Sequence, residues 1–200
     1  MTYIWALLIG YFLGSINFAV LVAKYKGLDL FSLGSGNPGA TNAKRTMGAF
    51  WGNTVFLLDF SKGYLAVSLT QSILGLEGFN YDLLGILGLL GAILGHSFSI
   101  FLKFRGGKGV ATTMGGLLAL MPWVLVLGIV AWLIVFFSTR VVAMASIVFA
   151  ISLPINFYFL HDLPDVRWIF CIVLAILIVV RHYSNIQRLL SGKEHDFSKK

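Results

Sequence analysis

The first apolar run of the chain, Thr2–Ala23, reads TYIWALLIGYFLGSINFAVLVA and is followed at once by Lys24 and Lys26. A run of about 20 apolar residues is long enough to cross a bilayer as a helix. No charged side chain occurs in the first 23 residues, so the basic region of a signal peptide is missing. We therefore expect a retained first transmembrane helix with its N-terminus outside.

Composition extends this expectation to the whole chain. Of the 200 residues, 58% are hydrophobic and 12% are charged, with a mean hydropathy of +0.88. Soluble domains carry about 25% charged residues. These values favour a polytopic membrane protein and exclude soluble enzymes, nucleic-acid-binding modules and disordered chains. The net charge of +7 then reports membrane topology rather than a nucleic-acid partner.

The hydrophobic pattern predicts an all-α membrane protein of about seven transmembrane helices in a single domain, residues 1–200. The expected spans are Thr2–Ala23, Ala49–Leu74, Tyr81–Leu102, Val110–Met121, Pro122–Ser138, Val141–Leu160 and Val166–Tyr183. The fourth is short for an upright crossing of about 30 Å, and is expected to be a half-helix or a re-entrant segment that ends at Pro122.

Charge supports this layout. If loops alternate sides, every Lys and Arg except Arg167 and Lys62 falls on the inner side, together with a basic tail that begins near Ser184. The outer loops hold acidic residues, namely Glu77, Asp82, Asp162 and Asp165. An excess of basic residues is typical of cytoplasmic loops, so the C-terminus is expected inside.

A first polar stretch, Gly34–Arg45, interrupts the apolar sequence at the inner side. Glycines allow backbone N–H groups to approach an anion, and Arg45 offers a planar fork to phosphate or carboxylate. The stretch also matches G-x-G-x-x-G, but no βαβ unit surrounds it, so we reject a dinucleotide site. An ordinary turn between helices remains the alternative.

Asp59 and Lys62 form a second polar feature inside an apolar run. Three residues apart on a helix, they share a face and can pair. A structural ion pair and a contact from Lys62 to a phosphate both remain open, because charged residues inside a membrane span are costly and often functional.

A third stretch, Gly95–Thr113, brings His96 together with Lys103, Arg105, Lys108 and the loop Gly106–Gly109. If Val110 begins a helix, its free N–H groups would favour an anion at this loop. The spacing is not that of a Walker A loop. For His96, a polar structural role and a catalytic role remain open.

The remaining polar groups lie near the inner ends of the last spans. The segment Arg181–Arg188 could be an interfacial anchor, and Ser146 could serve helix packing. Cys171 is expected to be a buried apolar side chain. Inner-side carboxylates are few, which argues against metal-dependent chemistry. An enzyme acting at the inner leaflet fits best, and a transporter of phosphate or organophosphate is the alternative.

Four blocks together resemble a known family. They are G-S-G-N-x-G-x-T-N from Gly34, D-x-x-K-G from Asp59, Gly95-His96 with F-x-G-G-K-G-V-A-T from Phe104, and R-H-x-x-N-I from Arg181. In this order and spacing they resemble the bacterial acyl-phosphate:glycerol-3-phosphate acyltransferases, the PlsY family, over nearly the whole chain.

This resemblance implies seven helices, a cytoplasm-facing active site in the bacterial inner membrane, and no metal or cofactor. It implies transfer of a fatty acyl group from acyl phosphate to the 1-hydroxyl of sn-glycerol 3-phosphate. The products would be lysophosphatidic acid and phosphate, the start of phospholipid synthesis. Acyl phosphate, glycerol 3-phosphate and membrane lipid are the implied partners, with no nucleic acid.

The resemblance also implies residue roles. The residues expected to hold glycerol 3-phosphate are Ser35, Asn37, Arg45, Arg105, His182 and Asn185. Those expected at the acyl phosphate are Gly106, Gly107, Lys108, Gly109, Thr112 and Ser146. Gly39, Thr41 and Asn42 are expected to shape the first loop, with Lys62 a further phosphate contact. Ser35 and Lys108 are expected to take part in catalysis, and either His96 or a substrate phosphate would be the base.

Overall fold

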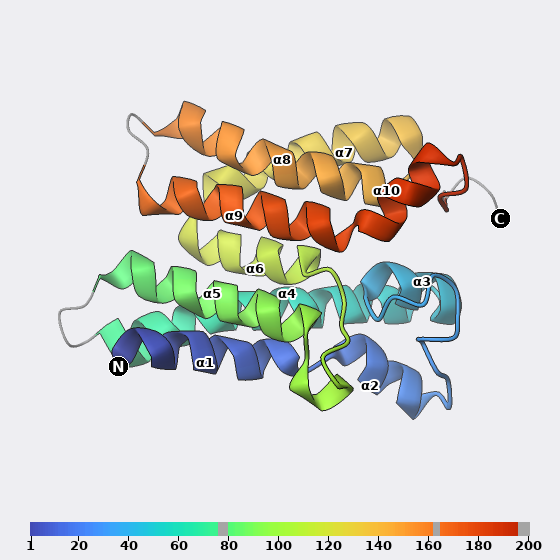
Figure 1. Cartoon of the computed structure of the whole chain (residues 1–200), viewed down its shortest axis with the longest axis horizontal. Coiled ribbons are helices and arrows are strands. Elements are labelled where there is room, and N and C mark those ends of the chain that lie inside the picture. Colours follow the sequence, from blue (N-terminus) through green and yellow to red (C-terminus); the bar gives the residue numbers. More distant parts are fainter. Residues whose placement is uncertain (76–79, 162–164, 196–200) are drawn as a thin grey trace. The chain divides into compact units, whose positions relative to one another are not determined.

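The computed structural model describes residues 1–75, 80–161 and 165–195 (Figure 1). Within these ranges the regular elements are helices, apart from one isolated bridge between Ser99 and Arg105. The chain forms two compact units, Met1–Leu120 and Met121–Lys200. Glu77, Asp162 and the last residues of the basic tail lie outside the described residues.

The first unit contains six α-helices in the described residues and one short 3₁₀ helix. They are α1 (Thr2–Ser15), α2 (Phe18–Tyr25), α3 (Ala40–Met47), α4 (Ala49–Leu74), α5 (Tyr81–Ser97), η2 (Ile100–Leu102) and α6 (Val110–Leu120). Helix α1 packs along α5, and α4 packs against both α5 and α6 (Figure 1). Glycines allow the close approach: a Cβ at Gly91 would collide with the Leu7 carbonyl, and one at Gly63 with the Thr112 carbonyl.

The second unit is built from α7 (Pro122–Thr139), α8 (Val142–Leu160), α9 (Val166–Arg181) and α10 (Tyr183–Leu190). Helix α8 packs against both α7 and α9 (Figure 1). Pro122 occupies the first turn of α7, where its missing N–H costs no hydrogen bond. The expected break between the fourth and fifth spans is confirmed, as is the helix start at Val110.

Length and composition qualify three segments of the described chain to cross a membrane. They are Thr2–Tyr25, which joins α1 and α2, then α7 and α8. The pair α9 and α10, bent by 59°, would be a fourth if it forms one span. Helices α5 and α6 are apolar but shorter, and α4 carries the charged residues Asp59 and Lys62.

The first span was predicted as one continuous helix, and this was wrong. The helix breaks at Ile16–Asn17, because the Asn17 side chain caps α2 by accepting a hydrogen bond from Val20 N at 2.9 Å. The same side chain donates to Pro38 O at 3.1 Å. Asn17 therefore ties the break in the first span to the glycine-rich stretch that precedes α3.

The break removes helical partners from two backbone carbonyls, and side chains from α4 and from the segment after α5 replace them. Ser99 Oγ donates to Ser15 O at 2.7 Å, and Lys62 Nζ donates to Ile16 O at 2.8 Å. Inside a bilayer no water is present to pair such groups. These two bonds therefore stabilise the break and fix it against α4 and the segment after α5.

Three further boundaries differ from the prediction. The third span ends at Ser97 rather than Leu102, because Ser99 pairs with Arg105 as the chain reverses direction. Residues 40–47, predicted as part of a loop, form α3. The segment from Ser184, predicted as a basic tail without regular structure, begins within α10. The other span boundaries agree with the prediction to within two residues.

Replacing Ser99 by Ala is expected to lower the free energy of unfolding by about 1–3 kcal/mol, because the buried Ser15 carbonyl loses its partner. Ser138→Ala is the matched control, since the exposed Ser138 hydroxyl bonds only to its own helix at Ile134 O. Thermal unfolding of both variants in detergent checks this. Equal stability of the two variants would contradict the role given to Ser99.

Candidate active site

The glycine-rich stretch before α3 is held in shape by Asn42. Asn42 is 1% exposed; its Oδ1 accepts from Ser35 N at 2.9 Å, and its Nδ2 donates to Leu33 O at 2.9 Å. Gly34 lies beside it at φ +58°, where a Cβ would collide with Asn42 Oδ1. The Asn42 amide is thus committed to the protein backbone, and its predicted role in shaping the loop has a structural basis.

Helix α3 carries Thr41 and Arg45, which sequence reasoning assigned to a loop. Gly39 precedes the helix, and the two side chains are four residues apart, so they share one face. Both are partly exposed, as are Ser35 and Asn37 in the preceding turn. A short helix gives Arg45 a more fixed position than a loop would.

A buried cluster of ionisable groups is formed by side chains of α4 and α5. Lys62 Nζ is 2.8 Å from Asp59 Oδ1 and 2.9 Å from His96 Nδ1. Side-chain exposure is 4% for Lys62, 2% for Asp59 and 5% for His96. The predicted pairing of Asp59 with Lys62 is confirmed. The sequence did not indicate that His96 would join it, since His96 lies on a different helix.

The loop Gly106–Gly109 packs directly on His96. Gly107 N donates to His96 O at 3.1 Å, and a Cβ at Gly107 would collide with the ring atom Nε2 of His96. A Cβ at Gly106 would collide with His96 O. Glycine is therefore required at both positions, and the ring edge that carries Nε2 faces the loop.

The start of α6 adds polar groups to the same region. Thr112 and Thr113 are fully buried, and their hydroxyls have no hydrogen-bond partner in the part of the chain that the structure describes. Gly109 has φ +79° and precedes Val110, where α6 begins with free N–H groups. The arrangement of N–H groups and hydroxyls suits an anion.

Arg105 connects the two polar stretches. Its guanidinium lies over the ring of Phe31, 4.1 Å from the ring centroid. Phe31 belongs to the segment that Asn42 organises, so Arg105 and the first loop lie together. Lys108 is partly exposed in the Gly106–Gly109 loop.

The second unit holds the other predicted residues. Ser146 is buried on α8 and accepts a hydrogen bond from Trp132 Nε1 at 3.3 Å. His182 lies where α9 meets α10, with Nδ1 2.7 Å from Ile178 O. Asn185 Nδ2 donates to Glu194 Oε1 at 2.9 Å.

Two contributors were missed by sequence reasoning. Asn17 could have been found, because Ser15 and Asn17 interrupt the first apolar run with hydrogen-bonding side chains. Glu194 gave no signal, since it lies in a polar tail, yet it bonds both Asn185 and Arg188. Among the described residues, no three His, Cys, Asp or Glu side chains group as metal ligands.

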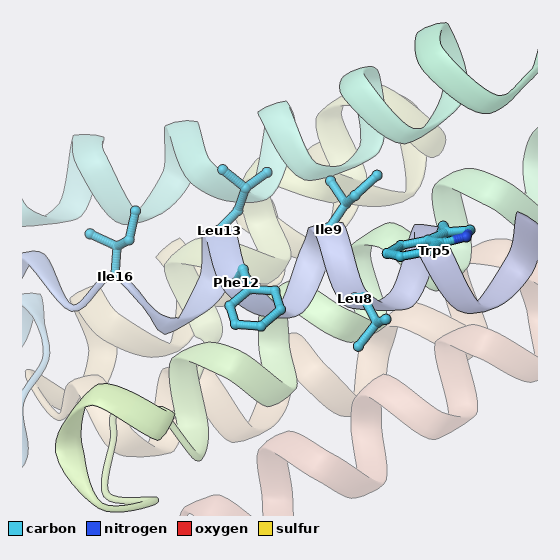
Figure 2. Close-up of a pocket in the computed structure, with 6 residues that line it drawn as sticks. All are labelled: Trp5, Leu8, Ile9, Phe12, Leu13 and Ile16. Atoms are coloured by element: carbon cyan, nitrogen blue, oxygen red, sulfur yellow. The ribbon is translucent and has the colours of Figure 1, made fainter.

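An apolar groove of about 380 Å³ runs along α1 (Figure 2). Its lining consists of Trp5, Leu8, Ile9, Phe12, Leu13 and Ile16. None of the predicted site residues lines this groove. Because its walls are aliphatic and aromatic, it suits hydrocarbon rather than a phosphate.

Comparisons with known proteins agree with the arrangement of these blocks. The family model of glycerol-3-phosphate acyltransferase matches residues 4–192. The chain is 42% identical to the glycerol-3-phosphate acyltransferase of Thermosipho melanesiensis, covering 97% of this chain and 92% of the relative. It is 40% identical to that of Aquifex aeolicus, covering 98% and 100%.

Solved structures agree as well. The chain is similar to the crystal structure of PlsY, an integral membrane glycerol 3-phosphate acyltransferase, in its glycerol 3-phosphate form. The TM-score is 0.89 at 38% identity, covering 98% of this chain and 96% of the other. The lysophosphatidic acid form of PlsY matches with a TM-score of 0.86 at the same identity and coverage. The chain therefore belongs to the PlsY family of integral membrane glycerol-3-phosphate acyltransferases.

Proposed function

We propose that the protein transfers a fatty acyl group from acyl phosphate to the 1-hydroxyl of sn-glycerol 3-phosphate. Lysophosphatidic acid and inorganic phosphate are the products. The carrying observation is the match over 98% of the chain to structures of PlsY in glycerol 3-phosphate and lysophosphatidic acid forms. The glycine-rich stretches Gly34–Gly39 and Gly106–Gly109, with the cationic side chains beside them, have the chemistry that binds anions.

Glycerol 3-phosphate is proposed to bind a set of polar and cationic side chains, each carried over from the family motifs. This set is Ser35, Asn37, Arg45, Arg105, His182 and Asn185. Arg45 and Arg105 would neutralise the phosphate, for which a planar guanidinium is well suited. Asn185 Nδ2 donates to Glu194 Oε1, which holds the Asn185 side chain in one orientation.

The acyl phosphate is proposed to lie at the Gly106–Gly109 loop. Lys108 supplies a positive charge, α6 supplies N–H groups, and Thr112 and Ser146 supply hydroxyls. Support comes from the unpaired buried hydroxyl of Thr112 and from the glycine backbone, which admits a phosphate closely.

In the proposed reaction the 1-hydroxyl oxygen attacks the acyl carbon, and the bond from that carbon to the phosphate oxygen breaks. The hydroxyl proton ends on the released phosphate. Acyl phosphates are already activated, so the main task of the site is to align two anions and offset their repulsion. No metal and no covalent acyl-enzyme is needed for this step.

In this proposal one earlier assignment, that of Asn42, is kept, and another, that of Lys62, changes. Asn42 shapes the first loop without touching substrate, because both ends of its amide bond to backbone. Lys62 lies behind the substrate, because its ammonium is surrounded by Asp59, His96 and the Ile16 carbonyl.

The test of the function uses purified protein in detergent with palmitoyl phosphate, glycerol 3-phosphate and a chelator. Phosphate and lysophosphatidic acid should form only when both substrates are present, with or without chelator. Arg45→Ala should lower turnover by about 100-fold or more, as expected for loss of a positioned charge. Lys24→Ala, at an exposed lysine of α2, is the control and should remain active.

A transporter is distinguished from an acyltransferase by placing the protein in vesicles with the same two substrates. Intact acyl phosphate, with labelled glycerol 3-phosphate crossing vesicles that contain the protein, would contradict the acyltransferase function and favour transport.

We further propose that the chain is one integral-membrane acyltransferase domain of seven spans in the bacterial inner membrane. The N-terminus would lie outside, and the active site would face the cytoplasm. The support is the gathering of basic residues and of the glycine-rich stretches on one side of the expected layout.

Cysteine labelling tests this topology in a Cys171→Ala background. An impermeant maleimide added to intact spheroplasts should label Asn80→Cys, at the outer start of α5, and should label Lys24→Cys only after the membrane is opened. Labelling in the reverse order would contradict the proposed orientation.

A further inference from the structure

We infer that Asp59 and Lys62 are positioning residues that hold His96 as a neutral ring with its proton on Nε2. In this form His96 donates a hydrogen bond toward the Gly106–Gly109 loop and does not act as the base. The inference rests on the acyl-transfer function proposed above and assigns Lys62 a role without substrate contact.

The ammonium group of Lys62 contacts three protein groups. An ammonium group has three N–H donors and no acceptor. Its nitrogen lies 2.8 Å from Asp59 Oδ1, 2.8 Å from Ile16 O and 2.9 Å from His96 Nδ1. The contacts with Ile16 O and His96 Nδ1 are hydrogen bonds, and the contact with Asp59 is an ion pair. The ammonium is held by three protein groups and its side chain is 4% exposed, which favours a role without substrate contact.

The second step concerns the His96 ring. Because Lys62 donates to Nδ1, that nitrogen accepts and carries no proton. The competing arrangement, a proton on Nδ1 shared with Asp59, has a distance of 3.6 Å, which is too long for a hydrogen bond. A neutral imidazole carries its proton on the other nitrogen, so Nε2 is the donor.

The third step is where Nε2 points. The collision that a Cβ at Gly107 would make with Nε2 shows that this ring edge lies against the loop proposed for the acyl phosphate. An Nε2–H group can donate to a phosphate or carbonyl oxygen. It has no lone pair with which to remove a proton from the attacking hydroxyl, so the base must be another group.

The break in the first span explains why a lysine is used. A polar group is needed to pair the Ile16 carbonyl in the membrane, and Lys62 pairs it while also bonding Asp59 and His96. One buried ammonium therefore connects the broken helix, α4 and α5. The orientation of His96 depends on all three elements.

The most direct test is nuclear magnetic resonance of the protein with ¹⁵N-labelled histidine. His96 is assigned by comparison with a His96→Gln variant, because the chain has four histidines. The expected spectrum shows an unprotonated Nδ1 and a protonated Nε2. A proton on Nδ1, alone or in an imidazolium, would overturn the inference.

A kinetic test separates positioning from a purely structural pair. Removing a buried charge alone is destabilising, whereas replacing both partners with apolar groups is often tolerated. The double variant Asp59→Leu/Lys62→Met is therefore compared with Lys62→Met and with the control Lys24→Met. Thermal unfolding in detergent accompanies each kinetic measurement.

If Lys62 positions His96, the double variant should fold and keep KM for both substrates close to wild type. Its kcat should fall about 10- to 100-fold, by analogy with residues that orient metal-ligating histidines. Wild-type kcat in a folded double variant would show a structural pair and overturn the inference. A rise in KM for either substrate that accounts for the lost kcat/KM would indicate direct contact and also overturn it.

Failure of the proposed function gives a different result. Wild-type protein would then form no lysophosphatidic acid, while the histidine spectrum would still report the protonation of His96. If the double variant does not fold, that spectrum of the wild-type protein decides the inference.

Discussion

Backbone carbonyls that lose their helical partners inside a membrane must be paired by the protein, and the break at Ile16–Asn17 creates this requirement. Ser99 pairs the Ser15 carbonyl, Lys62 pairs the Ile16 carbonyl, and Asn17 caps the next helix. These bonds fix the broken span against α4 and the segment after α5. The polar stretches of the first unit that resemble the family motifs are connected to these bonds through Pro38 and His96.

From this anchor the site can be followed outward through the first unit. Asn17 also donates to Pro38 O, and Pro38 lies two residues before α3, the helix that carries Arg45. Lys62 Nζ bonds His96 Nδ1. The His96 carbonyl accepts a hydrogen bond from Gly107 N, and the His96 ring packs against Gly107 in the Gly106–Gly109 loop. Buried polar groups thus connect the two loops proposed to bind the substrates. In the proposed function they would hold cationic and N–H groups in place before either anion binds.

Much of the fold could be predicted from sequence, because hydrophobic runs and charge report membrane helices directly. The starts of α4, α6 and α7 and the pairing of Asp59 with Lys62 followed from run length, proline position and helical spacing. The family was identified from four polar blocks in the right order.

The remainder depends on contacts between distant residues. No local pattern indicates that Lys62 lies beside His96, 34 positions away, or that Asn185 bonds Glu194. Short helices such as α3 are formed by tertiary packing rather than by propensity, so glycine and asparagine near their start read as a loop. These contacts show which polar residues support another side chain.

The proposed site positions two substrates and forms no covalent intermediate of its own. Isotope exchange tests this claim directly. The protein is incubated with acyl phosphate and labelled inorganic phosphate in the absence of glycerol 3-phosphate. Direct transfer predicts no label in acyl phosphate above a protein-free control, because the acyl carbon leaves phosphate only for the acceptor hydroxyl. Label that enters acyl phosphate at a rate comparable to turnover would show an acyl-enzyme and contradict the account.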